Sequence, residues 1–224
     1  MEKEKYVPEI KSQLRSRSVV VPEVIYRASG IKILGTRIKS LLFSTDVAII
    51  KNNNANSIMA VYPFTPQLSI THAILEVASV PVFVGVGGGL TSGPRSIQIA
   101  LQAELLGAYG VVVNAPTKND VIREMKSVID LPIVATVASL EDDYLGKLEA
   151  GVSILNISGG PKTSQMVMEI RSKVGKEVPI IATGGATEAS ILRTIDAGAN
   201  AITYTPPTSS EIFAEVMKAY RNSY

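Results

Sequence analysis

From residue 81 to residue 207 of this 224-residue chain, strand patterns and helix patterns alternate without interruption. The strand segments are short and almost continuously apolar, as strands of a parallel sheet are when both of its faces are covered. They are PVFVGVGGG (81–89), GVVVNAP (110–116), PIVATVAS (132–139), VSILNISGG (152–160), PIIATGGA (179–186) and AITYTPP (201–207). Amphipathic segments such as TKNDVIREMKSVI lie between them, so this part of the chain predicts six βα units.

The first third of the chain has to supply the remaining strands. It offers three apolar segments, at 19–26, 47–52 and 58–64. The last two are separated by only a few residues, fewer than the dozen or so that a parallel crossover needs, so both cannot be strands of one parallel sheet. We predict strands at 19–26 and 47–52.

These two strands bring the total to eight and predict a single-domain (β/α)8 barrel over residues 1–224. GTRIKSLLFS would be its first helix and PQLSITHAILEVAS its second. Residues 1–17 would form a leading segment, packed at the bottom of the barrel or on a partner. Residues 53–64 would form a long loop that follows the second strand and covers the barrel mouth or a neighbouring subunit.

Composition excludes several classes of site and partner. The chain has no cysteine, which rules out disulfides, thiolate metal sites and cysteine nucleophiles. Its apolar runs are shorter than the roughly 20 residues of a membrane span, and the charged N-terminus lacks the apolar stretch of a signal peptide, so we expect a cytoplasmic protein without a membrane partner. Twenty-two basic and 20 acidic residues, with no dense basic tract, argue against nucleic acid as a partner.

The working face of such a barrel lies at the C-terminal ends of its strands. The residues predicted there are rich in amides, hydroxyls and glycine, and they include no histidine and few acids. Among them are Thr136, Asn156, Tyr204 and Thr205. We therefore predict no metal site. Three residues are the predicted catalytic set, with Lys51 as a Schiff-base or general-base lysine, Glu23 as its acid or base partner, and Asn114 at the end of the 110–116 strand. Lys51 as a solvated charge at a loop entrance, and Glu23 as a surface residue, are the alternatives.

The segment IIATGGAT (180–187) places two glycines between a strand and a helix start. Glycine after a strand often marks a place where a ligand or another chain segment approaches the backbone closely. Backbone N–H groups at a glycine turn and at a helix N-terminus bind anions. We predict an anion site whose residues are Thr183, Gly184, Gly185, Ser158, Gly159, Gly160, Thr208 and Ser209.

The stretch PIIATGGATEASILRTIDAGANAI resembles the phosphate-binding group of aldolase-type barrels, which includes the keto-deoxy-phosphogluconate aldolases, thiazole synthase and the phosphosugar epimerases. The likeness covers roughly residues 80–210 and implies that Gly184 and Gly185 hold a substrate phosphate. The family has a second glycine-rich turn after its eighth strand, whereas this chain has Pro206 and Pro207, so the donors would come from the TSSE segment. The phrases STDVAII, AVYPFTP and NAITYTPP also resemble, along the whole chain, a set of uncharacterised bacterial barrels labelled only as hydrolases.

Together these features predict an enzyme of the lyase or isomerase type that acts on a small phosphorylated carbonyl or sugar compound, without a cofactor and as a homo-oligomer. A metal-independent hydrolase is an alternative, although no Ser-His-acid set can be assembled on the working face. A non-catalytic barrel that senses a phosphometabolite is another. A third is a barrel that binds flavin mononucleotide at the same glycines.

Overall fold

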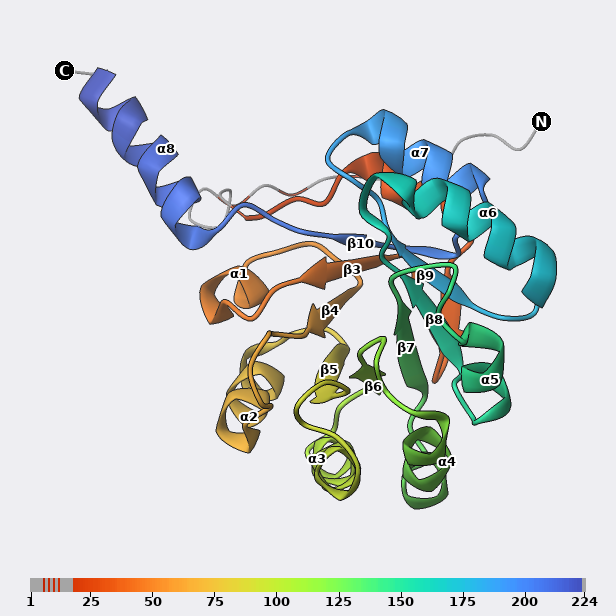
Figure 1. Ribbon diagram of the computed structural model, residues 1–224. Coiled ribbons are helices and arrows are strands. Elements are labelled where there is room, and N and C mark those ends of the chain that lie inside the picture. The colour runs from red at the N-terminus through yellow and green to blue at the C-terminus, as the bar shows by residue number, and fades with distance from the viewer. Residues whose placement is uncertain (1–5, 7, 9, 11, 13–17, 223–224) are drawn as a thin grey trace.

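The computed structural model describes residues 6, 8, 10, 12 and 18–222, and these form one (β/α)8 barrel (Figure 1). Eight parallel strands close in the order β10-β3-β4-β5-β6-β7-β8-β9. The barrel strands are β3 (Ser40–Phe43), β4 (Ser57–Ala60), β5 (Val82–Gly87), β6 (Gly110–Val113), β7 (Ile133–Val137), β8 (Ile154–Ile157), β9 (Ile180–Thr183) and β10 (Ala201–Tyr204).

Helices α1 to α7 surround these strands, and α8 leads away from the barrel (Figure 1). The helices are α1 (Val47–Lys51), α2 (Leu68–Val77), α3 (Pro94–Leu105), α4 (Asn119–Val128), α5 (Tyr144–Glu149), α6 (Thr163–Val174), α7 (Glu188–Asp196) and α8 (Ser209–Asn222), with a short 3-10 helix η2 (Gly160–Lys162) before α6. The six strands predicted between residues 81 and 207 are confirmed as β5 to β10. The fold class is therefore the predicted one.

The first third of the chain departs from the prediction. Residues 19–26 do not form a barrel strand, because Val19 makes only a single bridge with Asn53 and residues Glu23–Arg27 form the 3-10 helix η1. Residues 47–52 are not a strand either, because Asp46 caps α1 there by accepting hydrogen bonds from the N–H groups of Ala48 and Ile49.

The two missing strands lie in segments that were predicted as helix and loop. Strand β3 occupies the second half of residues 35–44, and β4 lies inside residues 53–64. As predicted, residues 47–52 and 58–64 do not both form barrel strands. The strand is in the second segment and not, as predicted, in the first. The predicted leading segment 1–17 falls almost wholly outside the described residues.

A short hairpin closes the N-terminal end of the barrel. Its strands β1 (Ile31–Ile33) and β2 (Thr36–Ile38) pair antiparallel, and Ile31 and Ile38 pack with the apolar layer inside the barrel. That layer contains one residue from each barrel strand: Leu41, Met59, Phe83, Val112, Val134, Ile154, Ile181 and Ala201. This layer therefore fills the barrel interior from its N-terminal end.

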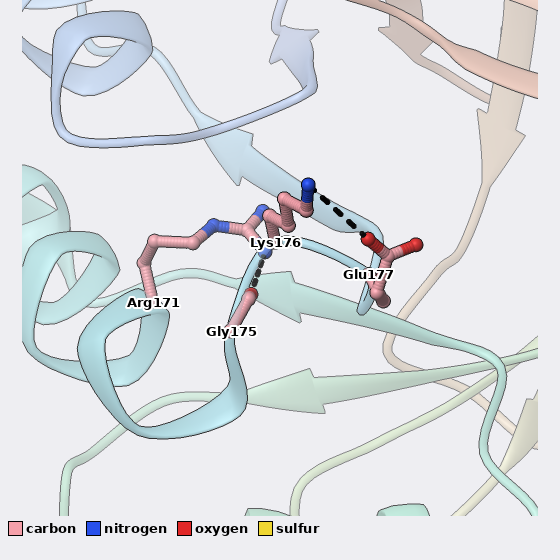
Figure 2. A network of polar contacts seen from close by, with 4 residues as sticks. All are labelled: Arg171, Gly175, Lys176 and Glu177. Carbon is pink, nitrogen blue, oxygen red and sulfur yellow. Dashed lines mark hydrogen bonds and ion pairs between the residues drawn. The ribbon is translucent and has the colours of Figure 1, made fainter.

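Arg171 of α6 binds several loops at this N-terminal end. Its Nη1 donates to the carbonyl oxygens of Gly175 at 2.6 Å and Val178 at 2.7 Å, and its Nη2 donates to that of Gly198 at 2.9 Å. Figure 2 shows the bond to Gly175 beside the pair Lys176–Glu177, whose charged atoms are 4.0 Å apart. Both partners of that pair are exposed, so it contributes little to stability. Arg171 instead supports the closed end opposite the mouth.

Candidate functional site

An arc of polar side chains lines the open end of the barrel. Each barrel strand contributes one residue to the apolar layer described above. On five neighbouring strands, the residue two positions further along is polar. Side chains two positions apart lie on the same face of a strand, so these polar side chains also point into the barrel. These residues are Asn114, Thr136, Asn156, Thr183 and Thr203. Across the mouth the corresponding positions are Phe43, Val61 and Gly85, which are apolar or bare. The mouth thus has one polar and one apolar side.

Two atoms of this arc lack a partner. Asn156 Oδ1 and Thr203 Oγ1 are buried and have no hydrogen-bond partner among the residues that the structure describes. The two side chains are 7% and 5% exposed, and the Asn156 amide nitrogen donates only a long bond, 3.4 Å, to Thr136 Oγ1. A buried polar atom without a partner costs about 1–3 kcal/mol. A ligand that hydrogen-bonds to both atoms would recover that cost.

A cavity of about 340 Å³ opens beyond β4, β5 and β6, at the same end of the barrel. It is lined by Tyr62, Pro63, Phe64, Thr65, Pro66, Gly87, Gly89, Leu90, Thr91 and Asn114. Its two loop walls are joined by a bond of 2.9 Å from Thr91 Oγ1 to Thr65 Oγ1. The Tyr62 hydroxyl accepts a bond of 2.8 Å from the Gln67 N–H, which leaves its own hydrogen available to a ligand.

Asn114 is held firmly at the inner end of this cavity. Its N–H donates to the Gly87 carbonyl at 3.0 Å, and its carbonyl accepts from Thr117 Oγ1 at 2.8 Å. Behind this turn, Lys147 of α5 is only 4% exposed and donates 2.8 Å bonds to the carbonyl oxygens of Ala115 and Thr117. Burial lowers the pKa of Lys147. Asn114 therefore lies at the predicted end of the barrel, on a rigid support.

The other two predicted catalytic residues lie elsewhere. Lys51 ends α1 and donates a bond of 3.0 Å to Ser79 Oγ, which precedes β5 and so lies at the N-terminal end of the barrel. Glu23 is exposed in η1. Tyr26 of the same helix and Val21, which precedes it, donate hydrogen bonds to Asn54, just before β4. The prediction that Lys51 and Glu23 reach the mouth is wrong, because it depended on barrel strands at 47–52 and 19–26.

The glycine pair after β9 is required by the packing of α7. A Cβ on Gly184 would lie 2.8 Å from both Ile191 and Ile202, and one on Gly185 would lie 2.6 Å from Ser190 Oγ. Gly185 also has a φ of +78°, which side chains disfavour. The bare backbone at 184–185 thus has a reason within the protein itself.

The residues predicted after β8 are engaged in starting α6. The Gly159 N–H donates to Thr163 Oγ1 at 3.0 Å, and that hydroxyl donates to the Gly160 carbonyl at 2.8 Å. The hydroxyl oxygens of Thr163 and Thr183 are 3.3 Å apart, and the Ser158 N–H donates to the Val137 carbonyl. The structure thus brings Ser158, Gly159, Gly160 and Thr183 together at one rim, with hydrogen bonds of their own.

Two carboxylates occupy the start of α8. Glu211 accepts bonds of 2.7 Å and 2.8 Å from the N–H and hydroxyl of Thr208, which lower its pKa. Ser209 Oγ donates to Asp46 at 2.5 Å, and this bond contributes most to the lowered pKa of Asp46. Donors predicted to hold a phosphate are therefore bonded to negative charges of the chain.

Within the described part of the chain, no group of three or more His, Cys, Asp or Glu side chains is placed to hold a metal ion. None of the helices described there is both long enough and apolar enough to cross a membrane.

Comparison with known proteins identifies the architecture. No family model and no curated protein matches the chain. Solved structures do match: phosphonopyruvate hydrolase in complex with oxalate and Mg²⁺ has a TM-score of 0.61 at 15% identity, over 83% of this chain and 81% of its own. The lyase for 2,3-dimethylmalate, a member of the PEP mutase/isocitrate lyase superfamily, has a TM-score of 0.62 at 12% identity, over 89% and 84%.

Dihydrodipicolinate synthase from Bacillus anthracis has a TM-score of 0.58 at 14% identity, over 82% of this chain and 76% of its own. At these identities the likeness establishes the barrel fold and no activity. The whole-length resemblance to hydrolase-labelled barrels gains no named relative from these comparisons.

Sequence reasoning had placed Thr136 and Asn156 on the working face, but it missed Thr203 and Tyr62. The pattern AITYTPP places the C-terminal end of this strand at Tyr204 and Thr205, just beyond Thr203. Tyr62 was assigned to a covering loop. One sequence pattern predicts Thr203 as a mouth residue: on consecutive strands, a polar residue follows an inward-facing apolar residue by two positions.

Proposed function

We propose that this barrel is an enzyme of the lyase or isomerase type that acts on a small hydroxylated carbonyl compound bound in its mouth. The observation that carries the proposal is the pair of buried, unpaired atoms Asn156 Oδ1 and Thr203 Oγ1 on strands flanking β9. Neighbours of the same fold include a lyase, a mutase and a hydrolase, which supports an enzyme.

The ligand class follows from the chemistry of the arc. Amide and hydroxyl groups are uncharged and both donate and accept hydrogen bonds, so they suit hydroxyl and carbonyl groups of a ligand. Asn156 Oδ1 needs a donor, which a ligand hydroxyl provides. A carbonyl oxygen directed at the cavity could accept the hydrogen of Tyr62, and such a donor stabilises the negative charge that develops there when a bond next to the carbonyl breaks.

A phosphate on the substrate is not required by this arrangement. The donors at the start of α8 are bonded to Glu211 and Asp46, whose charges repel an anion. Phosphorylated and unphosphorylated compounds are therefore compared directly in the test.

A second candidate is a barrel that binds such a compound without converting it. It is favoured by one observation: the five residues of the arc are asparagines and threonines, so the arc itself contains no acid or base. An enzyme of this kind would have to recruit its base from the rim.

Ligand binding is tested by titrating the protein with hydroxyacetone, dihydroxyacetone, dihydroxyacetone phosphate and flavin mononucleotide. Thr203→Val should weaken the binding of the hydroxyketones by about tenfold, the worth of one buried hydrogen bond. Thr194→Val is the matched control, because Thr194 is equally buried but bonded to the Ser190 carbonyl on α7. Unchanged affinity in Thr203→Val would contradict the proposed site.

Catalysis is tested in D₂O. An enzyme of the proposed type should exchange hydrogens next to the ligand carbonyl, whereas a binding protein should not. Exchange at the wild-type rate in Thr203→Val, measured at a ligand concentration below the dissociation constant, would show that the chemistry occurs elsewhere.

A further inference from the structure

One glycine at the mouth has no role in the packing of the chain. A Cβ on Gly87 would collide with Thr91, and one on Gly88 would collide with Asn114 and Thr117. At Gly89, by contrast, an added Cβ would meet nothing within 4 Å, and its φ lies outside the left-handed region. Gly89 lines the cavity beside β5. A side chain added here would meet no described residue at its Cβ and would stand at the wall of the cavity.

Two large apolar side chains stand exposed at the same cavity. Phe64 is 75% exposed and Leu90 is fully exposed, and both line it, from opposite loops. The bond between Thr65 and Thr91 holds these two loops together, so the two residues lie on one rim. Large apolar groups gathered around a cavity are a mark of a binding site.

Apart from Thr65 and Thr91, which are bonded to each other, the polar groups of the cavity are Asn114 and the Tyr62 hydroxyl, and Asn114 belongs to the arc. The cavity therefore has a polar part next to the arc and an apolar rim. Its volume of about 340 Å³ is large enough for a six-membered ring together with a short polar group.

We propose that this cavity is a subsite for a flat apolar group, such as an aromatic ring, carried by the ligand. The ring lies against the bare backbone of Gly89 and contacts Phe64 and Leu90. Its carbonyl end points towards Asn114 and the arc. This inference rests on the proposed function, because the arc holds the polar end, and it names the substrate class as a hydroxylated carbonyl compound with an apolar flat substituent.

The test compares two probes that differ only in a ring: hydroxyacetone and benzyl hydroxymethyl ketone. Wild-type protein should bind the ring compound about tenfold to a hundredfold more tightly, as burial of an aromatic side chain would give. Gly89→Val should remove most of this preference and leave the affinity for hydroxyacetone within about twofold. Because nothing lies near the added side chain, the variant should unfold at the wild-type temperature.

Ser92→Val is the matched control, because Ser92 is exposed on the same loop and does not line the cavity. It should leave both affinities unchanged. Equal affinity of the wild type for the two probes, no binding of the ring compound, or a preference retained in Gly89→Val would each overturn the subsite. If Gly89→Val abolishes the preference while Thr203→Val changes neither affinity, the subsite stands and the proposed use of the arc fails.

Discussion

Replacing Thr203 by Val should stabilise the fold while it damages the site. The Thr203 hydroxyl is buried and lacks a partner among the described residues, so folding strips it of water without compensation. Such a group costs about 1–3 kcal/mol, and Val has nearly the same shape. We therefore expect Thr203→Val to raise the free energy of unfolding by about 1–2 kcal/mol. For a chain of this length that is roughly 2–8 °C in the unfolding temperature.

The assay is urea unfolding at neutral pH, without ligand, followed by circular dichroism. Thr194→Val serves as the control, and it should destabilise the protein by roughly 1 kcal/mol because it removes a made hydrogen bond and leaves the Ser190 carbonyl without that donor. A loss of stability in Thr203→Val similar to that of the control would refute the reasoning, since it would mean that the Thr203 hydroxyl is paired in the ligand-free protein.

Further predictions concern residues whose roles the structure reassigns. Gly184→Ala should lower stability by about 1–3 kcal/mol in the same unfolding assay, because its Cβ would press on Ile191 and Ile202; a neutral effect would mean that α7 can shift. Lys51→Ala should leave the affinity for hydroxyketones within about twofold in a binding titration, and a larger loss would return Lys51 to the site. Asp46→Asn should cost about 1 kcal/mol at neutral pH, because the bond from Ser209 Oγ would lose its charged acceptor. Because the pKa of Asp46 is lowered in the folded protein, its stabilisation is present above the unfolded value of about 3.9 and is lost as pH falls through the folded one. Asp46→Asn should therefore show a shallower loss of stability in acid than the wild type, and an identical acid profile would contradict this.

The barrel could be predicted because its last six strands are apolar on both faces and separated by amphipathic helices. The first two strands could not be placed in the same way. VAIIK is as apolar as a strand, but it forms a helix that the carboxylate of Asp46 caps. SLLF is four residues long and follows charged residues, so its pattern fits a helix as well as the strand it forms.

The site was predicted less well, because its residues are defined by tertiary contacts. The glycines at 184 and 185 looked like an anion loop, but the side chains that require them come from α7 and β10. The placement of Lys51 failed with the strand count. The polar arc was within reach, since Asn114, Asn156 and Thr183 each follow an apolar residue by two positions, but the lack of a partner for Asn156 and Thr203 could be seen only in the folded chain.

The central claim, that the mouth binds a hydroxylated carbonyl compound through the arc, is tested most directly by nuclear magnetic resonance on isotope-labelled protein titrated with benzyl hydroxymethyl ketone. The side-chain amide signals of Asn114 and Asn156 and the methyl signal of Thr203 should shift together and saturate with one dissociation constant. The amides of Asn52 and Asn53, at the opposite end of the barrel, should not move. Shifts confined to Asn52 and Asn53, or no shift at the three mouth residues, would contradict the account.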